Sequence, residues 1–251
     1  MRACSAAPSA GRSRSSRSSD RSESNVNQNN RYSLRALALL LAYPDEGVRE
    51  HLPELMDAID TEAAIPADRR KELRAFAVEL SRMDTYEVES RYVETFDRGR
   101  NTSLHMFEHV HGDSRDRGPA MIDLGQTYQK AGLDLGAEEL PDHLCVVLEF
   151  ASTQPPAVAR EFLAEMAHVL TTIFSALLKR GSPYAAVLAA VLELAGQKVQ
   201  AVAIEAEEPM DEAWAEPEAF DGCSTRGQAR PGDPQPLHFV RRTTAQQGAV
   251  A

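Results

Sequence analysis

The stretch "SLRALALLLAYP" (residues 33–44) has the helical spacing of apolar residues that indicates the fold class of the whole chain. Leu34, Leu37 and Leu41 recur at helical spacing, and Pro44 lies where such a helix has to end. A leucine stripe of this kind is stable in water only when other apolar helix faces pack against it. The stretch therefore predicts an amphipathic helix within a helical core.

Helical periodicity continues toward the C-terminus as far as about residue 200. The predicted helices cover about residues 48–59 (with a break or kink at Pro53), 65–83, 84–96, 103–112, 119–132, 141–152, 156–179 and 183–199. No segment shows the sustained period-two alternation of a β-strand, and alanine and leucine dominate the apolar positions. The predicted fold class is all-α, a single helical-bundle domain.

The two ends of the chain differ in composition from the region between them. Residues 1–30 are rich in Ser and Arg, and residues 204–251 are acidic and then rich in Pro and Gly. Neither composition can bury a core, so both ends are predicted to be disordered tails. The expected domain organisation is an N-terminal extension (1–30), a helical domain (31–203) and a C-terminal tail (204–251).

Charge and cysteine content limit the class of protein. The formal net charge of -11 repels a phosphate backbone, so no nucleic-acid partner is expected, whereas a cationic peptide would be attracted. The three cysteines are far apart and form no CxxC motif, which fits a reducing compartment. No apolar run reaches the roughly 18 residues of a membrane span. A cytoplasmic protein without membrane insertion is expected.

The stretch "HVHGDSRDRGPAMIDL" (residues 109–124) holds the densest polar chemistry in the chain. A solvated connection between two helices explains it without any function. A metal site built on His105, His109 and His111 is a second interpretation, although the HxxxH spacing lacks the catalytic Glu of HExxH. A nucleophile at Ser114 is a third interpretation, but sequence adjacency shows no base held beside it.

A recognition surface is the remaining interpretation of this stretch. Its arginines can pair with carboxylates in a bidentate manner, and its aspartates can meet a cationic peptide. Farther along, Asp142 and His143 either contribute to that surface or cap the helix that follows Pro141. Glu149, which lies between Leu148 and Phe150, is expected to be a buried carboxylate.

Three quoted blocks carry a resemblance to a known family. They are "LLLAYPDE" (39–46), "YVETFDRGRNTSLHMFEHVHGDSRDRGPAMIDLGQTYQKAGL" (92–133) and "ELPDHLCVVLEF" (139–150). They resemble the nitrate reductase molybdenum cofactor assembly chaperones of the delta-subunit or NarJ/NarW type, within the wider TorD/DmsD redox-enzyme maturation family. The likeness runs from about residue 32 to about residue 200. His105 and Cys145 depart from the residues usual for that family, which are apolar and proline respectively.

The resemblance implies an all-helical, TorD-like cytoplasmic chaperone without catalytic residues, cofactor or metal. Its partner would be the apo catalytic (alpha) subunit of respiratory nitrate reductase, bound through an N-terminal segment and held competent for cofactor insertion. The expected client-binding residues are His109, His111, Asp113, Arg115, Asp116, Arg117, Asp123, Asp142 and His143. Two alternatives stay open: a helical metal-dependent hydrolase using His105, His109 and His111, and a general helical peptide-binding adaptor.

Overall fold

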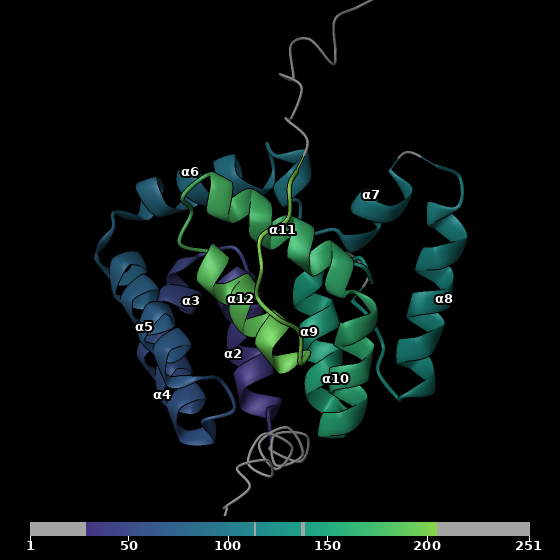
Figure 1. The fold of residues 1–251 in the computed structure, drawn as a ribbon, viewed down its shortest axis with the longest axis horizontal. Coiled ribbons are helices and arrows are strands. Elements are labelled where there is room, and N and C mark those ends of the chain that lie inside the picture. Colours follow the sequence, from purple (N-terminus) through teal and green to yellow (C-terminus); the bar gives the residue numbers. More distant parts are fainter. Residues whose placement is uncertain (1–28, 113, 137–138, 205–251) are drawn as a thin grey trace, which may run out of the picture. The chain divides into compact units, whose positions relative to one another are not determined.

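The computed structural model describes residues 29–112, 114–136 and 139–204 as a bundle of helices (Figure 1). The helices are α2 (Arg31–Leu41), α3 (Glu46–Glu50), α4 (Leu52–Glu62), α5 (Ala67–Arg82), α6 (Thr85–Phe96), the 3-10 helix η1 (Arg100–Thr102), α7 (Met106–His111), α8 (Arg117–Lys130), α9 (Leu144–Thr153), α10 (Pro156–Glu165), α11 (Ala167–Lys179) and α12 (Ala185–Leu194). Among these residues, β pairing is limited to one isolated bridge between His105 and His143. The all-α prediction is confirmed.

The centre of the bundle is built on α2 and α12. Every leucine of α2 except the exposed Leu39 is buried, and α2 packs against α4, α9 and α12. Glu62, at the end of α4, caps α2, because its carboxylate accepts hydrogen bonds from the backbone N–H groups of Tyr32 (3.0 Å) and Ser33 (2.7 Å). The helix predicted from the leucine stripe is therefore held at its N-terminus by a side chain 29 residues away.

Most predicted helix boundaries are confirmed, but the prediction of one long helix over residues 156–179 is wrong. The break expected near Pro53 lies at His51, with Pro53 in the first turn of α4. The helix predicted over residues 156–179 is broken at Met166, where α10 and α11 meet at 69°. No Pro or Gly announces this break. The bend lets Leu163 and Leu170, which flank it, both be fully buried, so tertiary packing overrides the continuous helical pattern.

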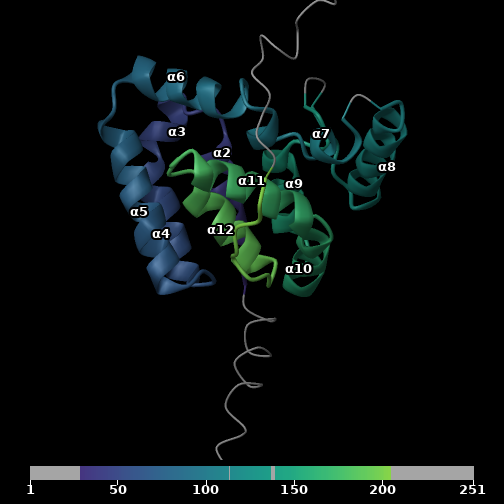
Figure 2. The ribbon, with the colours of Figure 1, turned by 45° about the horizontal axis from the view of Figure 1, so that its top comes forward.

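Helix α8 lies beside α7 at the edge of the bundle and is weakly embedded in it (Figures 1 and 2). Met121, Leu124 and Tyr128 share one face of α8 by their spacing, but of these three Tyr128 alone is buried. Its ring packs on Phe150 at 4.6 Å between centroids, and its hydroxyl donates to the carbonyl of Pro141 at 2.8 Å. This tyrosine is therefore the main anchor of α8.

Within the part of the chain that the structure describes, no single helix is long and apolar enough to cross a bilayer. Among the described residues, the pair α10 and α11 reaches the required length and composition when taken together, but the two helices are bent by 69°.

The domain limits drawn from composition lead to a testable prediction. Residues 1–28 and 205–251 lie outside the described residues, so the expected disorder of both ends stays a prediction. We expect a chain trimmed to residues 31–203 to keep its helical far-UV signal and a cooperative thermal melt, because the buried core lies within these limits. Circular dichroism on full-length and trimmed chains measures this, and a melt that loses cooperativity would contradict the limits.

Candidate functional site

Asp142 joins the start of α7 to the start of α9. Its side chain is fully buried, and one carboxylate oxygen accepts the backbone N–H of Phe107 at 3.1 Å. Its backbone carbonyl accepts the N–H of Met106 at 3.0 Å, and Leu144 N–H donates to the carbonyl of Leu104 at 2.9 Å. Asp142 therefore caps α7, a helix 35 residues earlier in the chain.

This arrangement corrects two expectations from the sequence. Of the two interpretations of Asp142, capping of the helix after Pro141 is wrong, because the N-cap of α9 is His143, whose side chain makes no capping hydrogen bond. A role of Asp142 in binding stays a prediction. The short helix expected from Ser103 begins only at Met106, where Asp142 supplies the cap. The start of α7 thus depends on a long-range contact that local sequence does not reveal.

The buried carboxylate of Asp142 lies close to two basic side chains. Arg117 Nη2 lies 3.8 Å from Oδ2 and 3.4 Å from the carboxylate of Glu108, and His105 Nδ1 lies 3.5 Å from Oδ1. The neighbouring carboxylate of Asp142 raises the pKa of His105. Burial, and next the charge of His105, lowers the pKa of His143, whose ring centroid is 5.0 Å from that of His105. The two imidazoles are therefore driven toward opposite protonation states.

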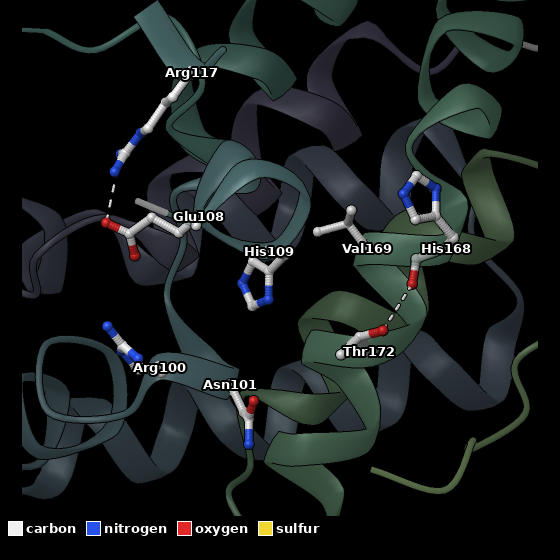
Figure 3. Close-up of a pocket in the computed structure, with 9 residues that line it drawn as sticks. Arg100, Asn101, Glu108, His109, Arg117, His168, Val169 and Thr172 are labelled. Atoms are coloured by element: carbon white, nitrogen blue, oxygen red, sulfur yellow. Dashed lines mark hydrogen bonds and ion pairs between the residues drawn. The ribbon is translucent and has the colours of Figure 1, made fainter. Parts of the chain in front are cut away.

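A pocket of about 450 Å³ opens beside this cluster (Figure 3). Glu108 and His109 from α7 lie on one side of it, and His168, Val169 and Thr172 from α11 lie on the other. The remaining lining residues are Arg100, Asn101, Gly112 and Arg117.

Internal hydrogen bonds hold the α7 side of this pocket in place. His109 Nε2 lies 2.9 Å from the carbonyl of Ser103, and the Ser103 hydroxyl donates to Glu108 at 2.5 Å. His109 and Glu108 are thereby fixed against the segment that precedes α7. The pocket is a preformed polar hollow with cationic and anionic groups on its wall, suited to binding a polar or charged chain segment.

The structure brings together four of the nine residues predicted to form the site. His109 and Arg117 line the pocket, and Asp142 and His143 form the turn behind Arg117. Arg115 and Asp116 are exposed in the turn before α8, His111 closes α7 with its ring 5.5 Å from Phe107, and Asp123 is exposed on α8. Asp113 lies outside the described residues.

The sequence missed the contribution of α11. His168, Val169 and Thr172 lie more than 40 residues from the charged stretch, and their spacing is that of an ordinary helix. Arg100 lies shortly after the end of a predicted helix, and the sequence does not reveal which residues lie beside it in the pocket. Glu149 is exposed, so the prediction of a buried carboxylate there is wrong.

The histidine-rich stretch does not form the metal site considered from its spacing. Among the residues that the structure describes, no three His, Cys, Asp or Glu side chains are grouped closely enough to hold a metal ion. His105 is the N-cap of α7 and faces Asp142, while His109 turns toward Ser103, so the two do not share a helical face. Cys145 is partly buried, and burial raises the pKa of its thiol to about 12, which keeps it unreactive.

More than half of the chain matches a known protein family. The family model described as nitrate reductase delta subunit matches residues 42–190, which include every helix from α3 to α11. The chain belongs to this family. The family region contains the Asp142 turn, the charged stretch and the α11 residues of the pocket, so the candidate site lies wholly within it.

Individual relatives agree with the family. The nitrate reductase molybdenum cofactor assembly chaperone NarJ of Escherichia coli K12 is 40% identical over 183 residues, covering 72% of this chain and 77% of NarJ. The same strain's "probable" assembly chaperone NarW is 39% identical over 166 residues, covering 66% of this chain and 69% of NarW.

A solved structure is similar at lower identity. It is described as a redox enzyme maturation protein from Archaeoglobus fulgidus, is 21% identical, and matches with a TM-score of 0.47 over 66% of this chain and 94% of that one. At these values the similarity adds nothing to the family assignment.

Proposed function

We propose that this protein is a chaperone for the assembly of respiratory nitrate reductase. The observation that carries the proposal is the 40% identity to NarJ across 77% of that chaperone's length. The client is the catalytic (alpha) subunit of the reductase before it holds its molybdenum cofactor. The chaperone binds this apo subunit, keeps it competent for cofactor insertion, and is absent from the finished enzyme.

The proposed action is non-enzymatic and takes place in the cytoplasm. The related proteins are named as assembly chaperones, which supports a holding role and gives no support to a metal-dependent hydrolase or a general adaptor. Binding the apo form lowers its free energy relative to states that aggregate, which is how a holding chaperone acts.

The client surface that we propose is the α7–α8 region with the pocket beside it. It comprises the charged connection before α8, the exposed Asp123, and the turn at Asp142 and His143. Support comes from His109 and Arg117, which line one pocket, and from Asp142, which lies behind Arg117, all within the part of the chain that matches the family. The bound segment is proposed to be the N-terminal segment of the catalytic subunit.

Titration calorimetry with a peptide of that N-terminal segment tests the proposed surface. Changing Asp116→Asn together with Asp123→Asn should weaken binding by about 1–2 kcal/mol, because both carboxylates are exposed and can meet cationic groups of the client. The loss should shrink at high salt, since the charges are solvent-exposed.

The matched control removes two exposed carboxylates elsewhere. Glu50 and Glu54 lie on α3 and α4, and replacing both with Gln changes the net charge by the same amount. This control should bind the peptide as the wild type does. Equal weakening in both double variants would mean that only net charge matters, and the proposed surface would be wrong.

A further inference from the structure

A second pocket is lined in part by Tyr128, where the chain returns from α8 to α9. Its volume is about 140 Å³, and its apolar lining includes Tyr128, Leu133, Val146 and Phe150. Tyr128 and Phe150 are buried and packed ring to ring, so this floor is rigid. Sites for whole small molecules usually measure about 300–1,000 Å³, so this pocket is of a size for a single side chain.

The polar rim of the second pocket is predominantly acidic. Asp134, Glu139 and Glu149 contribute three carboxylates, and Arg35 contributes one guanidinium. Of these, Glu139 accepts the backbone N–H of Gly136 at 3.0 Å. Asp134 and Glu149 are exposed, and among the described residues neither side-chain carboxylate accepts a hydrogen bond or forms an ion pair, although the backbone carbonyl of Glu149 accepts the Ser152 hydroxyl.

An apolar floor beneath a negative rim matches one kind of side chain. Lysine and arginine lay their aliphatic stems on apolar surface while their charged heads stay at its edge. A purely apolar side chain would leave the carboxylates unpaired, and an acidic one would be repelled. The chain's net charge of -11 adds a long-range attraction for a cationic segment.

We infer that this second pocket binds one lysine or arginine side chain of the client segment and thereby contributes to client specificity. The inference rests on the proposed function and deepens it. Asp134 and Glu149 contact the cationic head, and Leu133, Val146 and Phe150 contact the stem. Arg35 is a resident cation at the rim that opposes the incoming charge.

The test uses the full-length chain and a synthetic peptide of the N-terminal segment of the reductase's catalytic subunit. Asp134→Asn together with Glu149→Gln should weaken binding about tenfold, as expected for two partly exposed charge contacts. Arg35→Gln should act in the opposite direction and tighten binding about twofold. Glu50→Gln together with Glu54→Gln is the control of equal charge change and should leave affinity unchanged.

A double-mutant cycle assigns the pocket to one client residue. Each Lys or Arg of the peptide is replaced in turn by norleucine, which keeps the stem and removes the charge. One of these peptides should bind the wild type and the Asp134/Glu149 double variant almost equally, because the partner charges are then already absent.

The outcomes separate the two proposals. Wild-type affinity in the double variant, or no peptide that couples to it, overturns the inference while the chaperone function stands. A client segment without Lys or Arg overturns it in the same way. No peptide binding by the wild type overturns the proposed mode of client recognition and the inference with it.

Discussion

Replacing Asp142 with Ala is expected to lower the free energy of unfolding by about 2–4 kcal/mol. The substitution leaves the N–H of Phe107 without its acceptor and removes the buried carboxylate that faces Arg117 and His105. Arg117 is partly exposed, so water recovers some of the lost interaction. Urea unfolding measures the change. Asp123→Asn, an exposed carboxylate on α8, should change stability by less than about 0.5 kcal/mol.

The pH dependence of this loss gives a second readout. Because the folded pKa of His105 is raised, the stability from its pairing with Asp142 is complete below the ordinary pKa of about 6.5 and disappears as the pH rises through the folded value. His143 has a lowered pKa, so its protonation opposes folding as the pH falls, and losing Asp142 makes that worse. The destabilisation should therefore be larger at pH 6 than at pH 8. An equal loss at both would contradict the pairing.

The helices could be predicted from the sequence wherever one apolar face decides the structure. The stripe of Leu34, Leu37 and Leu41 is buried as predicted, and Asp84 caps α6 by accepting the N–H of Tyr86. The break at Met166 could not be predicted, because it follows from packing on other helices and not from a local breaker. Local sequence patterns indicate how readily a segment forms a helix, whereas such a bend is imposed by contacts with other helices.

The position of the candidate site could be predicted only in part, and its binding role stays a prediction. The high density of charged residues indicated residues 109–124 as a candidate recognition surface, and His109 and Arg117 of this stretch line a pocket. The role of Asp142 depends on its burial and on an acceptor geometry that joins residues 35 positions apart. Spacing alone had suggested a metal site for His105 and His109, but the cap on α7 points the two imidazoles in different directions.

Deleting the gene for this chain should abolish most nitrate reductase activity while the catalytic subunit is still made. The physical reason is that an apo subunit without a holding partner exposes surface that the cofactor and neighbouring subunits would cover, and such species aggregate or are degraded. Molybdenum measured on the purified reductase should fall together with activity. Full cofactor loading in the deletion strain would contradict the chaperone assignment.

Two complementation arms extend this test to the mechanism. The wild-type gene should restore both molybdenum content and activity, and Asp134→Asn with Glu149→Gln should restore them only in part, because the weakened chaperone occupies less of the apo subunit. Adding purified chaperone to finished reductase should change nothing, since a holding protein makes no contribution to the reaction itself. A rise in nitrate reduction on that addition would indicate a direct role in catalysis and would contradict the non-enzymatic action proposed for this family member.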